Sequence, residues 1–235
     1  MNVKVLLRGM NKKTYILGFG AILVLAGIVW YANWGKQPVD NQTASITDAT
    51  SDSPVELTDE FILGDKDAPV DIIEYSSHLC GYCAKFHSET LPLIIDKYVK
   101  EGQVKFVHRI VSPSILGIAV LCAGDQKGFW EFDEYLFEHI NEILEQINQA
   151  SSAEEAETMV VDSLKKAAGD LELNQDKFNQ CFDSGEHEEV VRGWFLKSNE
   201  DGVEGTPTFL INGQKVVGAL TYDSFEKIIE EKLNN

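Results

Sequence analysis

The stretch that decides the fold runs from Val70 to Cys83 and reads VDIIEYSSHLCGYC. Its first six residues, Val70–Tyr75, are mostly apolar, aromatic or β-branched, which predicts a buried strand. Two serines follow this strand, and residues 84–100 have the composition of a helix. The pair Cys80 and Cys83 therefore lies where a strand passes into a helix.

This position gives the two cysteines different predicted roles. Unpaired backbone N–H groups and the helix dipole lower the pKa of a thiol at a helix N-terminus from about 8.5. Cys80 is thus predicted to be the exposed nucleophile, and Cys83 the buried thiol that resolves a mixed disulfide. A zinc site would need two further ligands at matching spacing, and the chain has no second C-x-x-C. We expect no metal and no cofactor.

A second predicted strand, Val104–Val111, gives a β–helix–β unit whose strands should be parallel. The following region has apolar residues at helical spacing, with polar or glycine breaks between the segments. The predicted helices are Ile115–Ala123, Phe129–Ile147, Ala153–Ala168, Gln175–Phe182 and His187–Asn199.

Strands return near the C-terminus. The predicted strands Thr208–Ile211 and Lys215–Gly218 flank Asn212-Gly213, which is a hairpin turn signal. Pro207 lies directly before the first of them, a position that suits a residue unable to donate to the strand ladder. Tyr222–Leu233 is predicted to form the last helix. The order is therefore βαβ, a block of helices, then ββα.

Three further features have more than one interpretation. Glu74 lies in an apolar strand, and the alternation does not decide whether its side chain faces solvent. Cys122 and Cys181 are either two buried free thiols or a structural disulfide, which an oxidising compartment would permit. His78 and His87 flank the cysteine motif, and we expect them to pack or to face water.

The N-terminal region predicts a membrane anchor. The segment between Lys13 and Lys36 (residues 14–35) has no charged residue. A helix of this length can cross a hydrocarbon core of about 30 Å. The basic N-terminus (1–13) should stay in the cytoplasm of a bacterial cell, which places residues 58–235 outside it after a flexible linker at 36–57. A cleaved signal peptide is the alternative. The net charge of −18 excludes nucleic acid as a partner.

Together these features resemble the DsbA-like branch of the thioredoxin superfamily. The resemblance rests on Glu74, on Cys80-Gly81-Tyr82-Cys83, on Gly205-Thr206-Pro207-Thr208 and on the helical block between them. It implies an α/β thioredoxin fold with a helical domain inserted at about 113–202. It also implies that Pro207 is cis and faces the cysteine pair.

By the same resemblance, Thr206, Pro207, Gly81 and Tyr82 bind substrate, and Glu74 exchanges a proton with Cys83. The chain would then be a thiol–disulfide oxidoreductase. It would be a single-pass protein of the bacterial cytoplasmic membrane. Its partners would be exported proteins with thiols or disulfides and a membrane protein that resets the redox pair.

The sequence contains two opposing signals for the direction of the reaction. Strong oxidants of this branch have Pro-His between the cysteines, whereas Gly81-Tyr82 and Thr206 match the periplasmic disulfide isomerases. Those isomerases need a separate dimerisation domain, for which residues 37–54 are too short. We therefore expect a monomeric dithiol oxidase. Isomerase or reductase activity is the alternative, and a Cu(I)-binding thiol module is a further one, although the chain lacks a Met-rich or His-rich tract.

Overall fold

The computed structural model describes residues 62–234. The predicted anchor at 14–35 and the linker at 36–57 lie outside these residues. Within the described part, no helix combines the length and the apolar character needed to cross a membrane.

The described strands form one sheet in the order β1-β3-β2-β4-β5. Their bounds are Ile62–Leu63 for β1, Val70–Ser76 for β2, Val104–Ile110 for β3, Thr208–Ile211 for β4 and Gln214–Val217 for β5. Strands β2 and β3 are parallel, as the sequence predicted, and β4 joins β2 in antiparallel orientation. The edge strand β1 was not predicted.

The β4–β5 hairpin turns at Asn212 and Gly213, as predicted. Both residues have positive φ, +45° and +78°, which a two-residue type I′ turn requires. The Asn212 side chain also accepts a hydrogen bond from the backbone N–H of Asp71 at 2.7 Å and donates one to the Pro69 carbonyl at 3.1 Å. The hairpin is therefore tied to the start of β2.

Residues 81–99 form one continuous helical run after β2. It consists of α2 (Gly81–Lys85), the π-helical segment η3 (Phe86–Thr90), α3 (Leu91–Ile94) and a second π-helical segment η4 (Ile95–Val99). Pro92 lies in the first turn of α3, where a missing N–H is tolerated.

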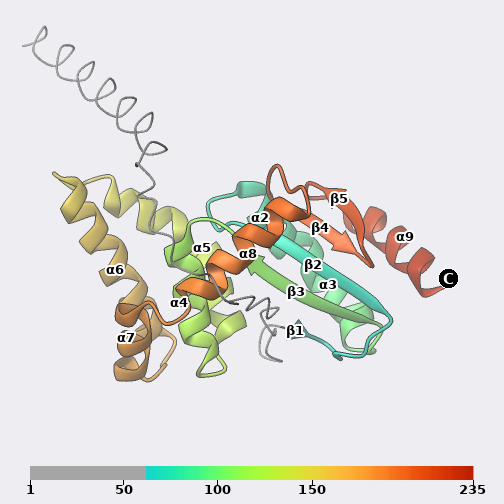
Figure 1. Ribbon diagram of the computed structural model, residues 1–235, viewed down its shortest axis with the longest axis horizontal. Helices are drawn as coiled ribbons and strands as arrows, with labels where there is room; N and C mark the ends of the chain where they lie inside the picture. Colours follow the sequence, from blue (N-terminus) through green and yellow to red (C-terminus); the bar gives the residue numbers. More distant parts are fainter. Residues whose placement is uncertain (1–61, 235) are drawn as a thin grey trace, which may run out of the picture. The chain divides into compact units, whose positions relative to one another are not determined.

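Five helices separate β3 from β4, and one more ends the chain. They are α4 (Ser114–Gly124), α5 (Phe129–Ile147), α6 (Ala153–Asp170), α7 (Gln175–Ser184), α8 (Glu188–Glu200) and α9 (Tyr222–Leu233). In Figure 1, α6 and α7 lie at one end of the domain and α9 at the other, with α8 crossing in front of the sheet.

The domain has two apolar cores. One lies between the sheet and the helices that follow β2 and β5, and it includes Phe86, Phe106, Phe209 and Phe225. The other fills the block α4–α8. Trp130 packs against both cores, which joins the helical insertion to the thioredoxin half. The thioredoxin-like α/β fold with a helical insertion is confirmed.

Candidate active site

The cysteine pair lies at the junction of β2 and α2, as predicted. Cys80 is the N-cap residue of α2, and its carbonyl accepts the first helical hydrogen bond, from the N–H of Ala84 at 3.1 Å. Cys80 is partly exposed, whereas the side chain of Cys83, one turn later, is fully buried. Both are free thiols. Tyr82 between them is 70% exposed, so the surface around Cys80 is open to another protein.

The loop before β4 faces this pair. The Thr206–Pro207 peptide bond is cis, as the resemblance implied. The Thr206 carbonyl oxygen accepts a hydrogen bond from the Cys80 thiol at 3.2 Å. This contact joins residues that are 126 positions apart in the chain and places the two motifs on one surface. A substrate chain held along Thr206 would therefore lie beside Cys80.

The surroundings of Cys80 favour its thiolate. Partial burial disfavours the charged form, but hydrogen bonds from the Thr206 side chain, from the backbone N–H groups of Cys83 and Tyr82 and from the Cys83 thiol outweigh this cost. The pKa of Cys80 is therefore lowered. The sequence predicted this shift from the position of Cys80 at the helix N-terminus.

The surroundings of Cys83 have the opposite effect. Burial disfavours its thiolate, and the nearby charge of Glu74 adds to this, so the pKa of Cys83 is raised to about 12. When the reduced pair loses one proton, the negative charge therefore lies on Cys80 and the remaining proton on Cys83.

Glu74 lies beneath the pair, inside the protein. Its side chain is fully buried in β2, so of the two interpretations that the sequence left open, the inward-facing one is correct. One carboxylate oxygen, Oε2, lies 2.8 Å from Nε2 of His87. His87 belongs to η3, which follows α2, and it is 10% exposed. The carboxylate is thus linked to an imidazole at the edge of the interior.

Three more buried residues, His78, His108 and Asp133, extend this contact. We call the five residues Glu74, His78, His87, His108 and Asp133 the histidine–carboxylate cluster. Asp133 comes from α5 of the insertion, and its Oδ1 lies 2.7 Å from Nε2 of His78. Its Oδ2 lies 3.1 Å from Nδ1 of His108 and 3.8 Å from Nδ1 of His87. The ring of Phe137 covers the cluster, with its centroid 4.2 Å from that of His87.

Charge within the cluster is unevenly distributed. Burial disfavours the charged form of Asp133, but His108 and His78 outweigh it, and the pKa of Asp133 is lowered. Burial also disfavours protonation of His108, yet the charges of Asp133 and Glu74 prevail and its pKa is raised. Burial prevails for His78, whose pKa is lowered.

The sequence did not predict this cluster. We expected His78 and His87 to pack or to face water, but both contact carboxylates inside the protein. The available signal was His108, which interrupts the apolar strand β3 just as Glu74 interrupts β2. The two residues are direct neighbours in the parallel register. Asp133 had no comparable signal, because only the packing of α5 brings it to the sheet.

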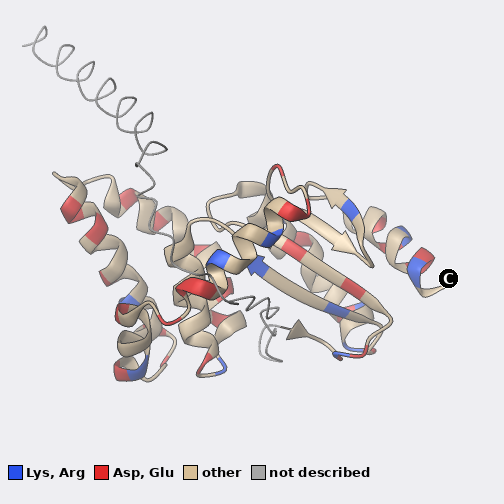
Figure 2. Cartoon of the chain, in the orientation of Figure 1, with Lys and Arg blue, Asp and Glu red and all other residues tan. Residues whose placement is uncertain are grey.

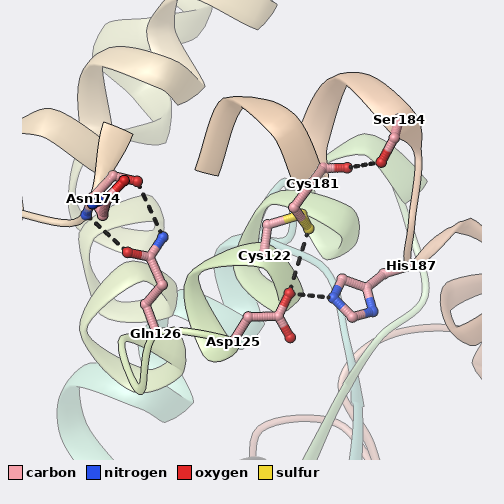
Figure 3. Close-up of a disulfide and its surroundings, with 7 residues drawn as sticks. All are labelled: Cys122, Asp125, Gln126, Asn174, Cys181, Ser184 and His187. Atoms are coloured by element: carbon pink, nitrogen blue, oxygen red, sulfur yellow. Dashed lines mark hydrogen bonds and ion pairs between the residues drawn. A yellow bond between two sulfur atoms is a disulfide. The ribbon is translucent and has the colours of Figure 1, made fainter. Parts of the chain in front are cut away.

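Cys122 and Cys181 form a disulfide between α4 and α7, with a Cα–Cα distance of 5.8 Å. This decides between the two alternatives that the sequence left open. Figure 3 shows the bond beside Asp125, whose carboxylate is 2.8 Å from Nε2 of His187. The nearby Gln126 side chain bridges to the backbone of Asn174 at the start of α7. The disulfide therefore fastens α7 to α4 within the insertion.

The comparison with known proteins agrees with this geometry. A thioredoxin family profile matches residues 56–231, which is most of the chain. The chain belongs to the thioredoxin family. Its curated relatives are named protein-disulfide oxidoreductase and disulfide bond formation protein, which confirms the resemblance seen in the sequence. Their names and the geometry of the cysteine pair both indicate thiol–disulfide oxidoreductase chemistry.

Two curated relatives illustrate the likeness. A putative protein-disulfide oxidoreductase of Rickettsia felis is 26% identical over 77% of this chain, which spans 64% of that protein. The disulfide bond formation protein D of Bacillus subtilis is 25% identical over 83% of this chain, which spans 86% of that protein.

Solved structures show the same fold. The alpha-DsbA1 protein of Wolbachia pipientis has a TM-score of 0.63 and 24% identity, covering 76% of this chain and 92% of its own. Oxidised BdbD from Bacillus subtilis has a TM-score of 0.62 and 23% identity, covering 74% of this chain and 93% of its own.

Proposed function

We propose that this protein is an extracytoplasmic dithiol oxidase, which introduces disulfides into exported proteins through Cys80 and Cys83. The observation that carries the proposal is the asymmetry of the two thiols, because the pKa of Cys80 is lowered while that of Cys83 is raised to about 12. Stabilisation of one thiolate favours the reduced form of a pair, which makes its disulfide a stronger oxidant.

The reaction proceeds in two exchanges. A thiolate of the client protein attacks Sγ of Cys80 in the oxidised enzyme, and the bond between Cys80 and Cys83 breaks. Cys83 leaves with the electron pair and takes a proton. A second client thiolate then attacks the client sulfur of the mixed disulfide and releases Cys80 as a thiolate. The client is oxidised by two electrons and the enzyme pair is reduced by two.

Each step has a structural support. The exposed position of Cys80 admits the client, whereas buried Cys83 is shielded from it. The low pKa of Cys80 makes it a good leaving group in the second exchange. Glu74, buried beside Cys83, is placed to supply the proton that this thiol takes up. Thr206 and Pro207 would hold the client chain beside Cys80, between the loop and the exposed Tyr82.

The proposed location rests on two observations. The uncharged segment 14–35 follows a basic N-terminus, which favours an anchored protein with its domain outside the cytoplasm. The Cys122–Cys181 disulfide is a feature of proteins in oxidising compartments. Once reduced, the Cys80–Cys83 pair needs an electron acceptor, and we propose a membrane redox protein for this role.

Trapping of mixed disulfides tests the proposal. In the Cys83→Ser variant, Cys80 can still form a mixed disulfide with a client, but no internal thiol can resolve it. We expect this variant to accumulate covalent adducts with exported proteins, which non-reducing gels would reveal and a reductant would release. The matched Cys80→Ser variant should form none. Equal trapping by both variants would contradict the assigned roles.

A further inference from the structure

The histidine–carboxylate cluster has an unusual charge composition for a protein interior. It contains two carboxylates, and both side chains are at most 2% exposed. Every ion pair that Glu74 and Asp133 make within residues 62–234 is with a histidine. Buried carboxylates are costly unless a positive charge compensates them. Here protonated imidazoles or a bound cation can supply the compensating charge, or a carboxyl group can take up a proton and become neutral.

Three members of the cluster have the arrangement of metal ligands. Glu74, His87 and His108 offer one oxygen and two ring nitrogens that all lie within 4.8 Å of one another. Two histidines and one carboxylate form a ligand set that holds Zn²⁺ with a fourth position left open. In a tetrahedral site with bonds of about 2.05 Å, two ligands lie about 3.3 Å apart. The widest pair would therefore have to close by up to about 1.5 Å when an ion binds.

Three atoms in this group lack hydrogen-bond partners, which is a second and independent observation. Oε1 of Glu74 and both ring nitrogens of His108 are buried and make no hydrogen bond among the described residues. Nδ1 of His108 lies 3.1 Å from Oδ2 of Asp133 as an ion pair. A carboxylate on the second nitrogen of a histidine is the usual way in which proteins orient that ring toward a metal.

An ion also has a route to the group. His87 and Asp133 line a pocket of about 880 Å³ that lies between the helical run after β2 and helix α5. Side chains of Trp130 and Phe137 form part of its apolar wall. An aqueous cation can therefore approach His87 without unfolding the core, whereas Glu74 and His108 lie deeper, at the fully buried side of the cluster.

We propose that Glu74, His87 and His108 bind one zinc-class dication inside the protein, with Asp133 as the positioning residue for His108. The site is separate from the two thiols and uses nitrogen and oxygen ligands only. It does not depend on the direction in which the thiol pair reacts. A bound ion would neutralise the excess negative charge of the cluster, and it would compete with the proton that Glu74 supplies to Cys83 in the exchange proposed above.

Zinc binding by the fully oxidised full-length protein tests this site directly. With both cysteine pairs in disulfides, no thiolate remains to bind the metal, so equilibrium dialysis against Zn²⁺ reports histidine and carboxylate ligands. We expect one Zn²⁺ per chain. The His87→Gln and His108→Gln variants should each weaken binding by at least about tenfold, and Asp133→Asn by about 10–100-fold. Co²⁺ in place of Zn²⁺ should give the visible absorption of a four-coordinate site.

Matched controls come from the remaining histidines. His139 and His187 lie outside the cluster, and His187 is beside the Cys122–Cys181 disulfide. Substitution of either by Gln should leave zinc binding unchanged. Should His108→Gln unfold the buried strand, His87→Gln, at the edge of the pocket, still decides the outcome. Absence of stoichiometric zinc in the wild-type protein, or binding that survives His87→Gln, would overturn the proposal.

Because the measurement uses only the oxidised protein and no client, its outcome is independent of the oxidase function proposed above. A protein that oxidises clients but binds no zinc would refute the metal site alone. A protein that binds zinc at these residues but fails to oxidise clients would refute the function alone.

Discussion

At the scale of single residues, the protein gives two cysteines of the same motif opposite properties. Cys80 is partly exposed at a helix N-terminus beside Thr206, and Cys83 is buried above the carboxylate of Glu74. One thiol therefore ionises readily and the other retains its proton. The nucleophile and the resolving thiol differ because of their surroundings, not because of their chemistry.

The lowered pKa of Cys80 predicts how the reduced protein reacts with pH. Iodoacetamide should label Cys80 with a half-maximal rate below the ordinary thiol pKa of about 8.5. Cys83 should stay unlabelled up to that pH, because burial protects it. Mass spectrometry of the labelled peptides measures both rates. Preferential labelling of Cys83, or a midpoint for Cys80 at or above a pH of about 8.5, would contradict the assignment.

The same shift has a consequence for stability. Folding lowers the pKa of Cys80, so its thiolate stabilises the folded reduced protein. This contribution is fully present above the unfolded-state pKa of about 8.5, and it is lost as the pH falls through the lower folded-state pKa. The oxidised protein has no such thiolate and should lack this dependence.

At the scale of elements, the sequence predicted the strands and helices that have a periodic apolar pattern and missed those that have none. The strands β2, β3 and β4 and the helices of the insertion have regular apolar patterns, and each lies close to its predicted position. The edge strand β1, Ile62–Leu63, has two residues and therefore no detectable pattern. The π-helical turns in 81–99 were also missed, because they do not alter the apolar pattern of the helix.

The candidate active site was likewise predicted only in part from the sequence. The cysteine motif was found because its spacing along the chain reveals it, and the role of Pro207 was found through the resemblance to DsbA-like proteins. The histidine–carboxylate cluster was not found, since it depends on the register of β2 with β3 and on the approach of α5 to the sheet. Contacts between His78 and Asp133, which are 55 positions apart, follow from tertiary packing that no local pattern encodes.

The disulfide between α4 and α7 predicts a large effect on stability. It closes a loop with a sequence separation of 59, for which the chain-entropy description gives about 4 kcal/mol. Joint substitution of Cys122 and Cys181 by Ala should lower the free energy of unfolding by roughly 2–4 kcal/mol, as measured by urea denaturation of the oxidised protein. The reduction potential of the Cys80–Cys83 pair should not change in this variant.

A matched control is the joint substitution of Cys80 and Cys83 by Ala. That pair would close only a short loop, so its loss adds little chain entropy to the unfolded state. A loss of less than about 1 kcal/mol for the Cys122 and Cys181 variant would show that the bond does not fasten the insertion.

At the scale of the whole molecule, the protein combines an acidic domain with a basic, apolar N-terminal region. Figure 2 shows acidic residues spread over α5, α6 and α8. The net charge of −18 arises although residues 1–39 contain no Asp or Glu. Anionic lipid headgroups repel an acidic domain.

The contrast between the basic, apolar N-terminal region and the acidic domain predicts the membrane topology of the protein. The protein should sediment with the membrane fraction, and protease added to intact spheroplasts should degrade residues 58–235, because the positive-inside rule keeps residues 1–13 in the cytoplasm. Immunoblotting against the domain measures both results. A soluble protein that lacks residues 1–26 would contradict the anchor, and full protection from protease would contradict the orientation.

The central claim is that thiolate stabilisation at Cys80 makes this protein an oxidant, and its reduction potential tests that claim most directly. The potential is obtained by equilibrating the purified full chain with glutathione buffers and quantifying the Cys80–Cys83 disulfide. An oxidase should have a value near that of DsbA, about −120 mV. A value near that of thioredoxin, about −270 mV, would contradict the claim and make the protein a reductase.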